Sequence, residues 1–345
     1  MNAVAAACAA AASPHGDPGV YSGSSAAALL LDKAQTFFDL GKQLNLRTPI
    51  GTHNGTLWAT DLPHVRAQLA WVWSHERWIL HDFLAVFQRR CQSAGATFVD
   101  SGANDGLWTL LAAAHGCHVL AVEPQPLCHA SLRMALAKNG FGPSQVELLN
   151  VGLAPSPRSF TLPSNWCSGT TRLRADGRYE RYSGSAPLRA PPSDGDGNTT
   201  GVRVATARLD ELASLRADAT PQLRIVLWHL DTEGAELPCL QSASRLMRER
   251  RIERITLEFD KFALLHLGSY GLAHLASRAA HGGVQPQANQ PALEAYGAVL
   301  DGSWHCVVSC IGQDFNFSVD SMNAFSFGRR CPHAGRPQDL TCTLV

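Results

Sequence analysis

The chain has 345 residues, of which 45% are hydrophobic and 17% are charged, so it can bury a sizeable core and is not disordered throughout. Lys and Arg together number 29, as do Asp and Glu, and this balance leaves no net field to attract a nucleic acid or an acidic membrane surface. A small or neutral partner fits this charge balance best. No apolar run approaches the roughly 20 residues needed to cross a bilayer.

Ten cysteines are scattered without a CxxC pair or a zinc-like spacing. We expect most of them to be small buried side chains in a reducing compartment, with room for one or two disulfides. Residues 1–25 are rich in Ala, Ser and Gly and are expected to form a disordered tail. A signal or transit peptide is the alternative, although no basic residue precedes the apolar stretch. The compartment is therefore undetermined, with the cytoplasm favoured over an organelle.

Two helices are expected before residue 96, at about 26–44 and 62–94. In the second, apolar residues from Leu69 to Phe87 recur at helical spacing. We interpret residues 26–95 as a helical lead-in or cap. Its tryptophans are more simply explained by a packed helix face than by a substrate pocket.

From residue 96 the pattern alternates between strands and helices with short links, which is typical of a parallel sheet covered on both faces. The strands are expected at 97–100, 118–123, 146–151, 202–205, 223–231 and 254–259. The helices are expected at 107–114, 127–139, 209–215, 237–250, 270–281 and 291–299. Segments 305–310 and 315–319 are expected to close the sheet as an antiparallel hairpin.

An interruption at 163–201 separates the two halves of this pattern, and its part from about 183 to 201 is rich in Ser, Gly and Pro. Such a composition predicts a mobile insertion. The main domain is thus expected over residues 96–330, and residues 331–345 are assigned to a C-terminal tail.

The first chemical signal is the run Asp100-Ser-Gly102-Ala-Asn-Asp-Gly106, between a strand and a helix. Glycines let the backbone turn tightly and approach a ligand, and the helix begins with free N–H groups. In the dinucleotide fingerprint a glycine opens the turn, whereas here an acid ends the strand. That acid suits a ligand with an ammonium or sulfonium group, and adenosylmethionine carries both. A tight turn without a ligand is the alternative.

The second signal is Glu123, at the end of the strand predicted at 118–123. In doubly wound folds an acid at this place accepts hydrogen bonds from both ribose hydroxyls. Glu123 lies 17 residues after Gly106, one helix and one strand farther on, so both face the same carboxyl edge of the sheet. We therefore predict that Glu123 binds a ribose.

The third signal is a set of carboxylates, Asp231, Glu233 and Glu236, after the apolar strand at 223–231. Burying ionised groups is costly, so we expect them to open onto a polar cleft at the carboxyl end of the sheet. Helix capping is the simpler explanation for one of the three. Glu258 ends the next strand and is a candidate to join them, and His229 is expected to be a packed core histidine.

Four segments together resemble the FkbM family of methyltransferases, and the similarity covers roughly residues 95–262. The segments are Phe98–Gly106, Val122–Pro124, Thr206–Leu212 and Leu230–Glu236. The resemblance implies the class I methyltransferase fold, an α/β, doubly wound, mostly parallel seven-stranded sheet of Rossmann-like type, here with an N-terminal helical extension.

The same resemblance implies S-adenosyl-L-methionine as cofactor and methyl transfer to a hydroxyl oxygen of a sugar or small natural product. Asp100, Gly102 and Gly106 would surround the methionine portion, Glu123 the ribose, and Asn150 onward the adenine. The full set expected to bind the cofactor is Asp100, Ser101, Gly102, Ala103, Asn104, Gly106, Glu123, Asn150 and Val151. The insertion and the tail depart from the family pattern, so the acceptor does not carry over.

An alcohol is a poor nucleophile at neutral pH and needs a base or a metal. Asp231 is the first candidate for the catalytic base, with Glu233 and Glu236 as supporting acids. No metal ligand is assigned, and Mg²⁺ held by these oxygen donors is the variant mechanism.

Alternative functions share the same cofactor site. They are methylation of nitrogen or of a protein side chain, and a non-catalytic protein that binds adenosylmethionine or acts as a scaffold. A nicotinamide dehydrogenase fits less well because of the glycine spacing. The expected partner is a small-molecule or sugar acceptor, with no nucleic acid and no transmembrane segment, and the oligomeric state is undetermined.

Overall fold

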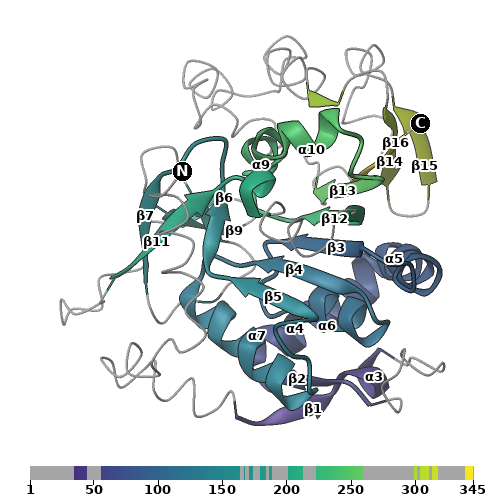
Figure 1. Ribbon diagram of the computed structural model, residues 1–345. Helices are drawn as coiled ribbons and strands as arrows, with labels where there is room; N and C mark the ends of the chain where they lie inside the picture. Colours follow the sequence, from purple (N-terminus) through teal and green to yellow (C-terminus); the bar gives the residue numbers. More distant parts are fainter. Residues whose placement is uncertain are drawn as a thin grey trace. The chain divides into compact units, whose positions relative to one another are not determined.

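The computed structural model forms two compact units. It describes residues 35–44, 56–163, 167, 171–173, 179–183, 186–188, 201–212, 223–258, 299–300, 304–310, 313–317 and 339–344. Unit 1 comprises Met1–Gly152, Arg158–Gly169 and Arg189–Thr206, and unit 2 comprises Leu153–Pro157, Thr170–Leu188 and Ala207–Val345. Each unit combines strands and helices (Figure 1), which confirms the predicted α/β class.

The centre of unit 1 is a parallel sheet with the order β3, β4, β5. The strands are β3 (Ala96–Ser101), β4 (His118–Val122) and β5 (Val146–Leu149), linked by α6 (Leu107–Ala114) and α7 (Pro126–Lys138). Every residue of β3 and of α6 is buried, as expected for a parallel strand and a helix enclosed on all sides. The predicted alternation is confirmed here, except that the strand predicted at 146–151 ends at Leu149 and Val151 begins a separate strand, β6 (Val151–Leu153).

The lead-in of unit 1 differs from the two predicted helices. A hairpin of β1 (Phe37–Asp39) and β2 (Trp58–Thr60) accompanies the short helix α3 (Leu40–Gln43). The predicted helix at 62–94 is two helices, α4 (Pro63–His75) and α5 (Arg77–Arg90), which meet at Glu76, a residue with non-helical backbone angles.

Helix α5 packs through the aromatic residues that gave the helical spacing. The ring of Phe83 lies 4.9 Å from that of Trp108, and the ring of Phe87 lies 5.0 Å from that of Phe98, in edge-to-face geometry. The apolar face of α5 is therefore packed, as the sequence indicated, whereas Trp73 of α4, which was predicted to belong to the same packed face, is 37% exposed.

The sheet of unit 2 has the order β12, β13, β16, β14, β15. Its strands are β12 (Arg224–Leu230), β13 (Arg254–Glu258), β16 (Asp339–Leu344), β14 (Trp304–Cys310) and β15 (Gln313–Phe317). Strands β12 and β13 are parallel, β16 runs antiparallel to both β13 and β14, and β14 and β15 form the predicted hairpin.

Strand β16 corrects the assignment of residues 331–345 to a tail. Its apolar residues Leu340, Cys342 and Leu344 alternate with polar ones, which is a strand signal that sequence reasoning missed, and its partners β13 and β14 follow only from the fold. Among the described residues the largest sheet has eight strands rather than the predicted seven. The predicted helix at 237–250 is divided at Ala243 into α9 (Glu236–Ser242) and α10 (Ser244–Arg248).

The remaining strands form two small sheets. Strand β11 (Gly201–Ala207) pairs antiparallel with β7 (Ser159–Pro163), and β6 (Val151–Leu153) lies on its other side. Within the expected insertion, β9 (Tyr179–Ser183) pairs with β8 (Thr171–Leu173) and β10 (Ala186–Leu188). Residues 1–25, most of 183–201, the helix predicted at 270–281 and all but the last residue of that at 291–299 lie outside the described residues.

Three disulfides correct the expectation of mostly reduced cysteines. They join Cys91 to Cys117 and Cys128 to Cys167 in unit 1, and Cys306 to Cys342 in unit 2, whereas Cys239 is buried and free. The paired residues are 26 to 39 positions apart in sequence, so only their proximity in the fold reveals the pairs. Among the described helices, none has the length and hydrophobicity to span a bilayer.

Candidate functional site

The glycine turn after β3 is fastened to the end of β4. Gly102, Asn104 and Gly106 all have left-handed backbone angles, with φ of 82°, 51° and 89°. The N–H groups of Gly102 and Ala103 both donate to the carbonyl oxygen of Val122, at 3.0 and 3.1 Å. The turn therefore brings the predicted cofactor loop against the residue that follows β4.

That residue is Glu123, and its two carboxylate oxygens hold the loop. The Oε2 atom accepts a hydrogen bond from the Asn104 N–H at 2.7 Å, and Oε1 accepts one from the Gln125 N–H at 2.7 Å. Glu123 is only 1% exposed, and burial raises its pKa to about 7. The sequence thus correctly predicted that the acid after β4 and the glycine turn come together.

Two further carboxylates are buried at the same turn. Asp100 is fully buried, and its Oδ2 accepts a hydrogen bond from the Thr109 hydroxyl at 2.6 Å. Asp105 is also buried, and the amide nitrogen of Gln68, in the orientation that satisfies both groups, donates to its two oxygens at 2.5 Å. Burial, together with the nearby charges of Glu123 and Asp100, raises the pKa of Asp105 to about 7.

Sequence reasoning missed Asp105 and its partner Gln68. Asp105 lies inside the quoted heptad, but its position before a helix is equally typical of a capping residue. Gln68 lies on α4, and nothing in the local sequence connects that helix to the turn.

The other residues predicted to bind the cofactor lie at the ends of the same strands. Ser101 is the fully buried last residue of β3. The Asn150 amide donates to the carbonyl oxygens of Glu123 and Pro124, at 2.9 and 3.0 Å, and so secures the backbone after β4. Val151 is buried where β6 begins. All nine predicted cofactor residues belong to unit 1.

The carboxylates predicted to be catalytic follow β12 in unit 2. Asp231, Glu233 and Glu258 are partly exposed, and one oxygen from each lies within 4.8 Å of the others. Oxygen donors in such an arrangement are of the type that Mg²⁺ prefers. His229 is buried in β12, in agreement with the expected core histidine.

Glu236 does not share the exposure of this cluster, which corrects the expectation that all three acids open onto a cleft. It is 1% exposed, and its Oε1 accepts hydrogen bonds from the Thr232 N–H, the Thr232 hydroxyl and the Gly234 N–H, at 3.0 to 3.1 Å. Burial raises its pKa. Of the three acids, Glu236 is therefore the one that accepts hydrogen bonds from the turn before α9.

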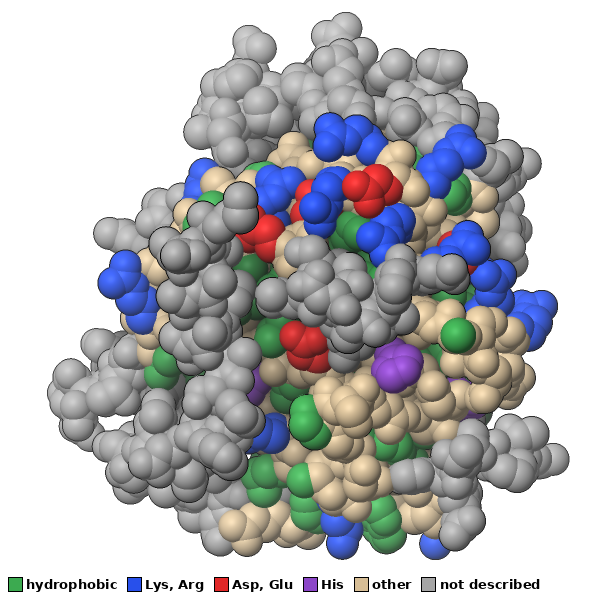
Figure 2. Space-filling view, in the orientation of Figure 1, with side chains coloured by type: hydrophobic (Ala, Val, Ile, Leu, Met, Phe, Trp, Pro, Cys, Tyr) green, Lys and Arg blue, Asp and Glu red, His purple; other side chains and the backbone are tan. Residues whose placement is uncertain are grey.

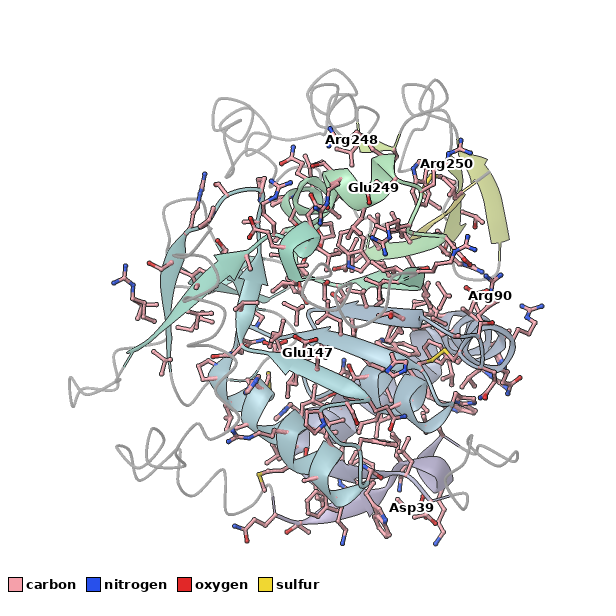
Figure 3. All side chains as sticks on the ribbon, viewed as in Figure 1. Asp39, Arg90, Glu147, Arg248, Glu249 and Arg250 are labelled. Atoms are coloured by element: carbon pink, nitrogen blue, oxygen red, sulfur yellow. A yellow bond between two sulfur atoms is a disulfide. The ribbon has the colours of Figure 1, made fainter. Side chains whose placement is uncertain are left out.

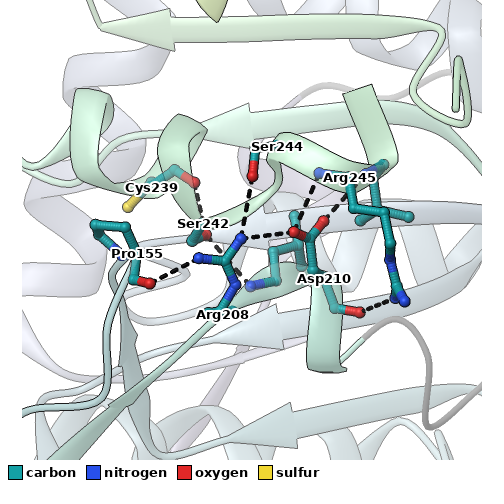
Figure 4. A network of polar contacts seen from close by, with 9 residues as sticks. Pro155, Arg208, Asp210, Cys239, Ser242, Ser244 and Arg245 are labelled. Atoms are coloured by element: carbon teal, nitrogen blue, oxygen red, sulfur yellow. Dashed lines mark hydrogen bonds and ion pairs between the residues drawn. The ribbon is translucent and has the colours of Figure 1, made fainter. Parts of the chain in front are cut away.

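Asp210 is the centre of a polar network within unit 2 (Figure 4). Its Oδ2 accepts hydrogen bonds from the Arg208 guanidinium at 2.8 Å and from the Arg245 N–H at 3.1 Å, and its Oδ1 accepts one from the Leu246 N–H at 3.0 Å. The carboxylate thus satisfies two N–H groups at the start of α10. The segment Thr206–Leu212 therefore has a structural role, because its Asp210 holds the start of α10.

Replacing Asp210 by Asn should lower the free energy of unfolding by about 2 to 4 kcal/mol, because an amide nitrogen would face a backbone N–H in a buried network. Urea denaturation measures this change. Glu249→Gln is the control at the opposite end of the same helix, because its carboxylate is exposed and lies 3.9 Å from Arg251. Equal stability of the two variants would contradict the role of Asp210.

Lys and Arg side chains predominate on the visible face around α10, with Asp and Glu side chains among them (Figure 2). Arg248, Glu249 and Arg250 are exposed at the end of this helix (Figure 3).

Comparisons with solved structures found methyltransferase domains. The METTL16 MTase domain has 10% identity, covers 89% of this chain and 93% of its own, and has a TM-score of 0.35. A delta-N METTL16 MTase domain has 10% identity, coverage of 82% and 84%, and a TM-score of 0.36. The human methyltransferase 10 domain containing protein has 11% identity, coverage of 77% and 80%, and a TM-score of 0.33. No curated protein matched the sequence.

The family itself is established by the sequence. Residues 100–275, about half of the chain, match the methyltransferase FkbM domain. This range contains the glycine turn, Glu123, the Asp210 network and the carboxylates after β12. The chain therefore belongs to the FkbM family of methyltransferases.

Proposed function

We propose that this methyltransferase binds S-adenosyl-L-methionine at the glycine turn of unit 1, with the ribose hydroxyls on Glu123. A carboxylate has about four acceptor sites, and the loop uses two of those of Glu123 through backbone N–H groups. The Gln125 side chain uses a third, which leaves about one acceptor site, and local rearrangement of Gln125 would provide the second for the ribose hydroxyls. Because Glu123 is nearly enclosed, cofactor entry requires local opening.

The observation that carries the proposal is the gathering of three buried carboxylates, Asp100, Asp105 and Glu123, at one turn. Burial and repulsion by the neighbouring carboxylates disfavour the ionised forms of Asp105 and Glu123. A ligand with sulfonium and ammonium charges relieves that repulsion, whereas a dinucleotide pyrophosphate would add to it. The charge of the turn thus favours adenosylmethionine over a nicotinamide cofactor.

For the acceptor we propose a hydroxyl of a sugar or small natural product. Membership of the FkbM family and the balanced charge support this class. The sulfonium is already a good electrophile, so the protein needs mainly to orient the acceptor and remove its proton. Asp231, which is partly exposed after β12, is the proposed base, with Glu233 as the supporting acid and Glu236 holding the turn.

Transfer of labelled methyl groups from the cofactor tests the acceptor class. Panels of sugars and alcohols, amines, and peptides are each incubated with wild type and with Asp231→Asn. Label in alcohols that is lost in the variant supports the proposal. Label confined to amines or peptides, or cofactor that binds and is not consumed with any panel, would replace it with one of the alternative functions.

Affinity for the cofactor should rise with pH between about 6 and 8. Without ligand, the pKa values of Glu123 and Asp105 are both about 7. A cationic ligand favours their ionised forms, so binding releases protons below pH 7, with a change of at most about tenfold per pH unit for each proton. Calorimetry over this range measures the effect.

S-adenosylhomocysteine is the control ligand for this pH dependence because it lacks the sulfonium charge. The ratio of the two affinities should therefore shift towards adenosylmethionine as pH rises. The same raised pKa values predict that the ligand-free protein loses stability as pH rises from about 4 to above 7, because the unfolded carboxyls ionise more readily. An affinity ratio that does not change with pH would contradict the electrostatic argument.

A further inference from the structure

A disulfide lies directly against the cofactor loop. The Sγ atom of Cys128 is 3.1 Å from the Oδ1 atom of Asn104, and the Sγ atom of Cys167 is 3.4 Å from the same oxygen. The two sulfurs are bonded to each other. Cys128 is fully buried, and Asn104 is nearly so. The side chain of Asn104 is thus confined by both halves of the bridge.

The bridge draws together segments that are distant in sequence. Cys128 is in the first turn of α7, three residues after Gln125, whose N–H holds the Oε1 atom of Glu123. Cys167 comes from the segment after β7. His64 of α4 approaches it from a third direction, with its Nε2 atom 3.1 Å from the Cys167 sulfur.

Confinement of Asn104 matters because its own N–H holds the other oxygen of Glu123. Asn104 adopts a left-handed φ of 51°, which Asn tolerates better than most residues but less readily than Gly, so the surroundings help to hold it there. Bonded sulfurs carry no hydrogen, so their contact with Asn104 acts by restricting space. Separated thiols would release that restriction.

We propose that the Cys128–Cys167 disulfide is a positioning element of the cofactor site and that its reduction weakens cofactor binding. This inference rests on the proposed function. Reduction by a dithiol breaks the S–S bond and transfers two electrons and two protons, which gives two cysteine thiols and the oxidised dithiol. Asn104 then leaves its left-handed conformation more often, and Glu123 loses a fixed N–H donor.

The test compares two disulfides of unit 1. Cys117 precedes β4 and Glu123 follows it, so the Cys91–Cys117 bridge is at the opposite end of the strand from the cofactor loop. Affinity for S-adenosylhomocysteine is measured by calorimetry for wild type, for Cys128→Ala/Cys167→Ala and for Cys91→Ala/Cys117→Ala, each with and without dithiothreitol. Hydrogen exchange of residues 101–106 is followed without ligand.

We expect Cys128→Ala/Cys167→Ala to bind at least about tenfold more weakly than wild type, with faster exchange at Asn104 and no further response to dithiothreitol. Cys91→Ala/Cys117→Ala should bind like wild type when oxidised and lose affinity on reduction. Should the first variant unfold, reduction of wild type and of the second variant provides the same comparison.

The two proposals fail in different ways. Wild type that binds the ligand equally well in both redox states, with unchanged exchange at residues 101–106, would overturn the positioning role alone. Oxidised wild type that binds no ligand would overturn the proposed function. In that case, faster exchange on reduction would still support control of the loop by the disulfide, and unchanged exchange would refute it.

Discussion

Replacing Glu123 by Gln is expected to weaken adenosylmethionine binding by about tenfold to a hundredfold, the equivalent of about 1.5 to 3 kcal/mol for hydrogen bonds to a charged group. Both carboxylate oxygens already accept backbone N–H groups, from Asn104 and Gln125. A glutamine must turn its amide nitrogen towards one of these donors, so it disturbs the loop as well as the ribose contact. Calorimetry measures the change.

Glu147→Gln is the matched control for this variant. Glu147 lies on the neighbouring strand β5 and is partly exposed, and neither the sequence nor the site assigns it a role in cofactor binding. It should bind the cofactor like wild type. Equal affinity in Glu123→Gln, with its fold intact by circular dichroism, would refute the ribose assignment.

The second large effect is expected from Gly106→Ala, which should lower the free energy of unfolding by about 2 to 5 kcal/mol. Gly106 has a φ of 89°, and a Cβ atom there would lie 2.1 Å from the Cδ1 atom of Leu132. Leu132 is buried in α7, so it has little room to move. The glycine is thus required by helix packing as well as by the turn, and urea denaturation measures the loss.

Substitutions at two other glycines distinguish the backbone strain from the steric clash as causes of this loss of stability. Gly140 has a φ of 76° but open space where a Cβ would lie, and Gly142 has open space without a left-handed φ. Gly140→Ala should therefore cost only the backbone strain, about 1 to 2 kcal/mol, and Gly142→Ala should be close to neutral. If Gly106→Ala and Gly140→Ala were equally destabilising, the predicted clash with Leu132 would be wrong.

Local patterns were sufficient to predict the centre of unit 1. Helix α6 was predicted over 107–114 and forms over those residues, because a compact apolar run follows a glycine turn. The proximity of the turn to Glu123 also followed, because parallel strands present their carboxyl ends at one edge.

Features that depend on distant partners could not be predicted. The alternation of Leu340, Cys342 and Leu344 with polar residues is compatible with a strand, but the pairing of β16 with β13 and β14 cannot be derived from it. The disulfides join residues whose spacing matches no motif. Glu236 resembled its neighbours Asp231 and Glu233 in sequence, yet its carboxylate turns inward to the Thr232 and Gly234 N–H groups. Whether such a carboxylate faces solvent or is buried depends on which hydrogen-bond donors the folded chain places beside it.

A crystal structure with S-adenosylhomocysteine tests the central assignment most directly. We expect both ribose hydroxyls within hydrogen-bonding distance of the Glu123 carboxylate, and the amino acid portion beside the turn that runs from Gly102 to Gly106. The assignment would be contradicted by a nucleoside that occupies another part of the chain and leaves Glu123 bonded only to the Asn104 and Gln125 N–H groups.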